Sequence, residues 1–249
     1  MSPHDEPLDG GFVADIPKSK ALYEQLVQFH WEYYSALENQ RIRIYDSLTK
    51  SLRERAAPFE LSKWQRVVKY KYALHPLGTN GSVVDPGGRF NIGEINKTRY
   101  PVFPALYVAS DKRTALAELL GRSTSGQSLT PEEVALTKPD SIAAVSVSGH
   151  LDAVLDIGDD RNLAAFVALI KGFRLPPTLT SKASRLGFPP RIIKTVQELT
   201  TVLHASDWRN WPALYDTPAA CQIFGRIVLD AQVEGVLLPA NLDSQGLVF

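Results

Sequence analysis

Apolar residues at helical spacing near the N-terminus restrict the fold of this chain most strongly. The eight members of this stripe follow one another in steps of three, four or seven residues: Leu22, Leu26, Phe29, Tyr33, Leu37, Ile44, Leu48 and Leu52. Such steps return to one face of a helix, and charged side chains occupy the opposite face. The pattern predicts one amphipathic helix, or two helices broken near Asn39, ending before Pro58. Two roles are open: packing on its own domain, or an arm for homodimerisation or partner binding.

The chain changes character twice. Residues 1–16 are polar and acidic and are expected to form a flexible tail, after which Pro17 marks a helix start, because its missing N–H is not needed there. From Trp64 to Tyr72, β-branched and aromatic residues are typical of a strand. We therefore expect a tail at 1–16, a helical extension at 17–63 and a further domain at 64–249.

Composition excludes several classes of function. The chain has 27 basic and 27 acidic residues, so no global field attracts nucleic acid or an acidic membrane. A single cysteine and five scattered histidines do not have the spacing of a metal site. The N-terminus lacks a signal-peptide pattern, and no segment approaches the roughly 20 apolar residues that cross a bilayer. We expect a cytoplasmic protein that holds no metal and contacts neither membrane nor nucleic acid directly.

Strand and helix patterns alternate after residue 64. The expected strands are 105–109, 141–147, 153–157 and 235–239, with a last one at 246–249, and the expected helices are 112–120, 163–173, 192–204 and 217–231. Residues 176–190 are rich in proline and predict an irregular stretch. The domain is therefore expected to mix helices and strands.

Four residues in this domain have side chains suited to a phosphorylated nucleotide. Arg66 lies in a predicted strand, and Arg89 lies in a glycine-rich segment, 87–91, where backbone can approach a ligand closely. Tyr107 ends a strand and can stack on a flat ring. Glu118 follows in a helix, and a carboxylate there can stabilise a sugar ring that becomes positively charged. Ordinary roles compete at each position: exposed strand or turn arginine, core tyrosine, solvated helix carboxylate.

Two other groups have weaker chemical signals. Cys221 falls on the inward side of a predicted helix, where a cysteine usually acts as a small apolar residue. Asp156, Asp159 and Asp160 lack the regular spacing of a calcium loop and predict a helix cap before Arg161.

The order of motifs from Trp64 to Phe249 resembles the RES domain family. The motifs are Gly-Gly-Arg-Phe-Asn at 87–91, Leu-Tyr-Val-Ala-Ser at 106–110, Ala-Leu-Ala-Glu at 115–118 and Glu-Gly-Val-Leu-Leu-Pro at 234–239. This resemblance implies an α+β fold with an ADP-ribosyltransferase-like core, a split and mainly antiparallel sheet flanked by helices. It also implies a toxin that degrades cellular NAD+ as its substrate and a partner that is an Xre-type antitoxin.

The resemblance also implies roles for individual residues. Arg66 and Arg89 match the family's arginines and are expected to bind the pyrophosphate or ribose side of NAD+. Tyr107 matches the tyrosine expected to frame the nicotinamide, and Glu118 matches the glutamate expected to stabilise the ribosyl cation.

Three further residues are expected to contact NAD+, namely Gly88, Phe90 and Asn241, while Ala240 departs from the family pattern. A serine is expected after the proline of the last motif, and a methyl group cannot replace its hydrogen bonds. This leaves three functions open: cleavage of NAD+ by water or phosphate, transfer of ADP-ribose to a protein, or an NAD-binding module without activity.

Overall fold

The computed structural model describes residues 10–120, 142–188, 190–238 and 246–248. The chain divides into two compact units, Met1–Arg43 with Phe173–Ile192 and Ile44–Gly172 with Ile193–Phe249. No described helix is both long enough and apolar enough to cross a membrane.

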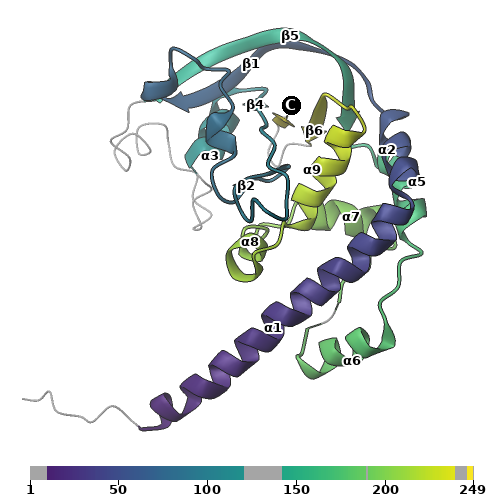
Figure 1. The fold of residues 1–249 in the computed structure, drawn as a ribbon. Coiled ribbons are helices and arrows are strands. Elements are labelled where there is room, and N and C mark those ends of the chain that lie inside the picture. Colours follow the sequence, from purple (N-terminus) through teal and green to yellow (C-terminus); the bar gives the residue numbers. More distant parts are fainter. Residues whose placement is uncertain (1–9, 121–141, 189, 239–245, 249) are drawn as a thin grey trace, which may run out of the picture. The chain divides into compact units, whose positions relative to one another are not determined.

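The first unit consists of a long helix, α1 (Gly10–Arg43), and a shorter one, α6 (Pro177–Arg185), coloured purple and green in Figure 1. Their core contains Phe29, Leu179 and Ala183, all buried. The Gln40 amide pairs with the backbone of Arg174, donating to its carbonyl at 2.9 Å and accepting from its N–H at 2.9 Å. This unit therefore folds around segments more than 130 residues apart in the sequence.

The predicted pair of helices is confirmed, but Leu22 of the stripe is 49% exposed and three of the predicted boundaries are wrong. Helix α1 begins at Gly10, inside the predicted tail, and Pro17 lies within it rather than at its start; a proline removes one backbone hydrogen bond, and here the helix continues past it. The break between α1 and α2 (Tyr45–Arg53) lies at Ile44, whose φ of −123° is not helical, rather than near Asn39. Strand β1 (Ala57–Lys69) begins inside the predicted helical extension, because its first residues pair with a distant strand.

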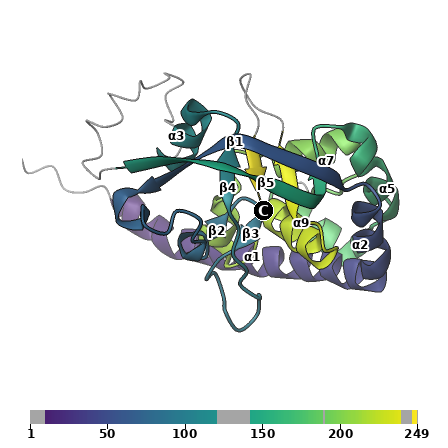
Figure 2. The same cartoon turned by 90° about the horizontal axis from the view of Figure 1, so that it is seen from above.

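The second unit is built on a closed five-stranded barrel in the order β1, β4, β7, β6, β5. The other strands are β4 (Tyr107–Ala109), β5 (Ile142–Asp156), β6 (Gly235–Leu238) and β7 (Gly246–Val248). Only β5 and β6 pair in parallel; the other barrel pairs are antiparallel. Figures 1 and 2 show the two long strands, β1 and β5, running side by side over the shorter ones. The mixed α+β class and the mainly antiparallel sheet are confirmed.

Side chains from every barrel strand form one apolar cluster. Its buried members are Leu61, Trp64, Leu106, Val108, Val154, Leu237 and Leu247. Strand β5 runs unbroken where two strands were expected at 141–147 and 153–157. The polar residues between these segments are paired with β1, for example Gly149 with Leu61, so long-range pairing outweighs their low strand propensity.

Helices cover the second unit with buried apolar faces. They are α2, α3 (Lys112–Leu120), α5 (Asp160–Ile170), α7 (Val196–Leu203), α8 (Asn210–Tyr215) and α9 (Ala220–Asp230). Two 3-10 turns, η1 (Tyr70–Tyr72) and η2 (Asn80–Ser82), follow β1. The predicted helix at 112–120 is confirmed, and Asp111 caps it by accepting the Thr114 N–H at 2.9 Å. The segment expected to be irregular contains α6, whose Pro177 occupies the first turn, where proline is tolerated.

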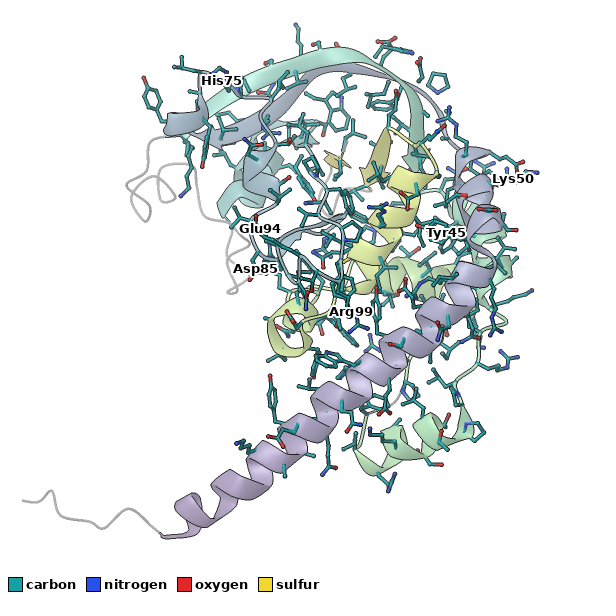
Figure 3. All side chains as sticks on the ribbon, viewed as in Figure 1. Tyr45, Lys50, His75, Asp85, Glu94 and Arg99 are labelled. Atoms are coloured by element: carbon teal, nitrogen blue, oxygen red, sulfur yellow. The ribbon has the colours of Figure 1, made fainter. Side chains whose placement is uncertain are left out.

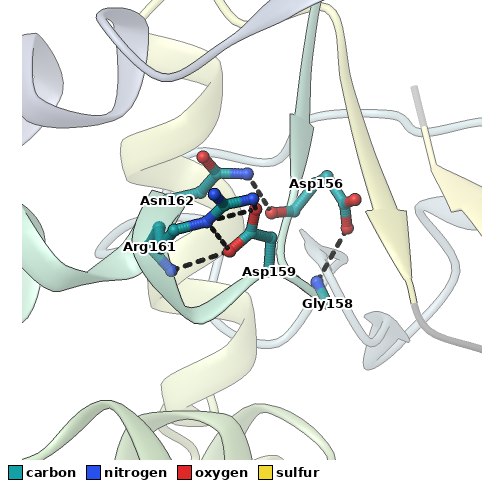
Figure 4. Close-up of polar contacts among 5 residues, drawn as sticks. All are labelled: Asp156, Gly158, Asp159, Arg161 and Asn162. Atoms are coloured by element: carbon teal, nitrogen blue, oxygen red, sulfur yellow. Dashed lines mark hydrogen bonds and ion pairs between the residues drawn. The ribbon is translucent and has the colours of Figure 1, made fainter.

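The aspartate cluster caps α5, as predicted. Figure 4 shows the Asp159 carboxylate accepting the Arg161 N–H at 3.0 Å, while Asp156 accepts the Gly158 N–H at 2.8 Å. The Arg161 side chain also bonds Asp159, and these bonds lower the pKa of Asp159 to about 2. Both acidic groups therefore act in local structure.

Candidate functional site

A two-stranded hairpin carries the Gly-Gly-Arg-Phe-Asn motif. Strand β2 (Gly87–Gly88) pairs with β3 (Asn91–Ile92), so Arg89 and Phe90 form the turn. Gly87 has a φ of +93°, which strongly favours glycine. A Cβ on Gly88 would lie 2.2 Å from the Tyr107 hydroxyl oxygen. Gly87 is therefore required by its backbone conformation, and Gly88 is required by the close approach of Tyr107 on β4.

Tyr107 and Asn91 fasten this hairpin to the barrel. The Tyr107 hydroxyl donates to Asn91 Oδ1 at 2.8 Å and accepts the Phe90 N–H at 3.1 Å. Asn91 is fully buried, and its amide donates to the carbonyls of Ser82 at 2.7 Å and Phe103 at 3.2 Å. Every polar atom of this buried amide is therefore engaged, which favours one hairpin position over others.

Helix α9 holds the hairpin from the other side. Gln222 is fully buried, and its Oε1 accepts the Ala219 N–H at 3.0 Å. Its Nε2 lies within hydrogen-bond distance of three hairpin carbonyls, those of Pro86 at 2.8 Å, Gly88 at 3.1 Å and Asn91 at 3.1 Å. One side chain therefore sets the distance between α9 and both strands of the hairpin.

Arg89 is held at the end of α7. Its Nη1 donates to the carbonyls of Leu203 at 3.1 Å and Ala205 at 2.8 Å. Its guanidinium carbon lies 5.9 Å from the ring centroid of Trp208, which is only 2% exposed. The two carbonyls and the indole ring fix the direction of the Arg89 side chain.

Arg66 projects from β1 and is only partly satisfied. Its Nη2 donates to the Gly78 carbonyl at 2.8 Å. Its Nη1 is buried and has no hydrogen-bond partner in the part of the chain that the structure describes. Burial lowers the pKa of this guanidinium. A desolvated cationic N–H without an acceptor is a strong site for an anion.

The segment from Gly78 to Asn91 links Arg66 with Tyr107. Gly78 contacts Arg66, and Ser82, four residues later, contacts Asn91, which is bonded to Tyr107. In the sheet, Gln65 on β1 lies opposite Ala109 on β4. By strand alternation Arg66 and Tyr107 then leave opposite faces of this pair. Strand pairing therefore does not bring these two side chains together, although the 78–91 segment contacts each of them.

Glu118 lies on α3, which packs against both β1 and β4. Ala115 and Leu116 of this helix are buried with Val67 and Ala109. The backbone of Glu118 is therefore on an element in contact with the strands that carry Arg66 and Tyr107. Asn241 and Ala240, two other residues singled out from the sequence, lie outside the described residues.

A family model matches the part of the chain that contains these elements. The RES domain family model matches residues 63–248. The chain belongs to the RES domain family. Among solved structures it is similar to the M. tuberculosis MbcT–MbcA toxin–antitoxin complex, at 17% identity and a TM-score of 0.43, covering 81% of this chain and 80% of that one. No curated protein matches it.

Three residues of this RES domain were not assigned a site role from sequence: Asn91, Gln222 and Trp208. Asn91 belongs to the motif at 87–91, whereas Gln222 and Trp208 lie outside the quoted motifs. The role of each depends on partners far away in the chain, such as Pro86 for Gln222, 136 residues distant. A buried amide has the same sequence signature as an exposed one, so only the fold reveals the role.

Cys221, the remaining candidate from the sequence, has a structural role in the RES domain. Cys221 is buried, and burial raises the pKa of its thiol to about 12, so the sulfur stays protonated and unreactive. His75 is exposed in the loop after η1, and Figure 3 marks it there. Tyr45, also marked, donates to Asp230 at 2.6 Å and ties α2 to α9. Among the described residues no group of three histidine, cysteine or acidic side chains is arranged to hold a metal ion.

Proposed function

We propose that this RES domain is a toxin of a toxin–antitoxin system that consumes NAD+ by breaking its nicotinamide–ribose bond. Arg66 carries the proposal: a buried guanidinium nitrogen without a partner among the described residues is costly unless an anion reaches it. NAD+ supplies such an anion in its pyrophosphate. Membership of the RES family supports the same substrate.

The roles of the other groups follow from how they are held. Arg89, fixed by two carbonyls, would bind a second phosphate oxygen or the ribose. The Tyr107 hydroxyl is engaged in the hairpin, so its ring would face the nicotinamide. Gly88, in the same hairpin, allows Tyr107 to approach because it has no side chain. The ring centroids of Phe90 and Phe224 lie 6.5 Å apart, so Phe90 also holds the turn against α9.

The chemistry requires charge stabilisation more than proton transfer. The bond between ribose C1′ and the nicotinamide nitrogen breaks, and its electron pair goes to that nitrogen, which neutralises the pyridinium ring. Glu118 would stabilise the cationic ribose. Water then bonds C1′ and releases a proton, giving ADP-ribose, nicotinamide and H⁺; phosphate in place of water gives ADP-ribose phosphate. The leaving group is already cationic, so the step does not require a Lewis acid.

The test is turnover of NAD+ by the purified chain. We expect loss of NAD+ with release of nicotinamide in chromatography, and mass spectrometry with and without phosphate identifies the acceptor. Glu118→Gln is expected to abolish turnover and keep binding, whereas Glu54→Gln, an exposed glutamate at the end of α2, serves as the matched control. If the purified wild-type chain binds NAD+ and leaves it intact, cleavage by the chain alone is refuted. The binding-module function, which Ala240 favours, and transfer of ADP-ribose to a protein would then remain.

Two further expectations belong to this proposal. In cells, expression is expected to lower cytoplasmic NAD+ and stop growth, and an Xre-type antitoxin is expected to restore both. ADP-ribose found on host proteins instead of in solution would identify a protein ADP-ribosyltransferase. We also propose that α1, which exposes Trp31 and Ile42, mediates self-association. Size-exclusion chromatography tests this, because Trp31→Glu should then elute as a smaller species than the wild type.

A further inference from the structure

Trp208 brings Arg89 together with Arg209, an arginine that is not among the predicted site residues. The indole is 2% exposed, and its ring centroid lies 5.9 Å from the guanidinium carbon of Arg89 and 4.6 Å from that of Arg209. The two guanidinium groups are therefore no farther apart than the sum of these distances. Burial raises the pKa of the nearby Cys221 thiol, and the positive charges of Arg89 and Arg209 oppose this rise.

Arg209 is held by an aromatic ring rather than by a carboxylate. Its side chain is exposed, and within residues 10–120, 142–188, 190–238 and 246–248 it forms no ion pair. Its guanidinium group makes a cation–π contact with the Trp208 indole instead. By contrast, Arg161 and Arg226 are paired with neighbouring aspartates. Stacking on an aromatic ring restricts the long side chain without neutralising it or occupying its N–H groups.

We propose that Arg209 joins Arg89 in a two-arginine phosphate subsite built across Trp208, which binds the diphosphate of the substrate. This rests on the proposed function and extends it. A planar guanidinium bonds two phosphate oxygens at once, and two of them on one indole suit a group with two adjacent phosphates. The subsite selects nucleoside diphosphates and dinucleotides over nucleotides with one phosphate.

The test measures binding of ADP to the full chain by calorimetry, so that turnover is not needed. We expect Arg209→Gln to weaken ADP binding about tenfold or more and to leave adenosine binding unchanged. In turnover, KM for NAD+ should rise while kcat is retained. Arg55→Gln, an exposed arginine after α2, is the matched control and should bind ADP like the wild type. Because Arg209 is exposed, the thermal midpoint should not change, which excludes misfolding as the cause.

The outcomes separate the subsite from the proposed reaction. If Arg89→Gln loses ADP binding and Arg209→Gln does not, the subsite is refuted and the reaction stands. If Arg209→Gln loses ADP binding while the wild type binds ADP but leaves NAD+ intact, the subsite stands and the reaction is refuted. If Arg209→Gln weakened the binding of AMP as much as the binding of ADP, the subsite would also be overturned, because it requires two phosphates.

Discussion

Replacing Gly225 by alanine tests how closely α9 must approach the hairpin. A Cβ at this position would lie 1.9 Å from the carbonyl oxygen of Phe90 and 2.6 Å from its carbonyl carbon. Non-bonded carbon and oxygen atoms rarely approach closer than about 3.3 Å. The overlap is with backbone, which cannot rotate away, so the helix and the hairpin have to separate by roughly an ångström or more.

The magnitude follows from two opposing effects. Overpacking a core costs about 1–3 kcal/mol, and replacing a helical glycine by alanine returns about 1 kcal/mol. Because backbone must move, we expect an overpacking cost near 3 kcal/mol and therefore a net decrease of about 2 kcal/mol in the free energy of unfolding. For a chain of this length that lowers Tm by about 4–8 °C. Phe90 follows Arg89, so the shift also displaces the guanidinium, and a displacement of about 1 Å can reduce turnover about 100-fold.

The assay is thermal unfolding followed by circular dichroism, with NAD+ turnover measured on the same samples. Gly149→Ala is the matched control, because nothing lies within 4 Å of the Cβ that it adds in β5. We expect this control to unfold like the wild type or slightly higher. A Gly225→Ala protein that unfolds at the temperature of the Gly149→Ala protein would refute the close approach on which this reasoning depends.

Three further outcomes are expected. Gln222→Met leaves the carbonyls that Gln222 contacts unsatisfied and should lower the free energy of unfolding in urea by about 1–3 kcal/mol. Gln197→Met, on the exposed side of α7, should change it little, and equal effects of the two substitutions would contradict the role of Gln222. Burial lowers the pKa of His30 from 6.5 to about 4. Between these pH values the unfolded chain binds more protons than the folded chain, so stability falls as pH drops. The urea midpoint of His30→Leu should therefore depend less on pH in this range than that of the wild type, and an equal dependence would contradict the prediction. The Cys221 thiol, with a pKa of about 12, should resist iodoacetamide at pH 8 in the folded protein and react in urea, and rapid labelling of the folded protein would show that it is not buried.

Local patterns predicted most elements because their signals lie between neighbours in the sequence. The helices α1 and α2 and the aspartate cap before Arg161 depend on residues only a few positions apart, and both predictions are confirmed. Boundaries failed where a distant segment decided the outcome. Strand β1 extends back to Ala57 because that residue pairs with Val154, and no local signal marks this pairing.

The site could be predicted in part for the same reason. Arg66, Arg89, Tyr107 and Glu118 were identified by motif, and their joint role in binding NAD+ stays a prediction. Trp208 could not be connected with Arg89 from sequence, because the two are brought together by α7 and the segment after it.

Amino-acid order alone determined that this chain carries an amphipathic helical segment followed by a RES domain, since helical periodicity and motif order are properties of adjacent residues. Tertiary structure decided that the strands close into a barrel, that Gly88 and Gly225 must lack side chains, and that Arg89 meets carbonyls 114 and 116 positions away. Those outcomes depend on which distant backbones approach one another, and such approach is settled only when the whole core packs.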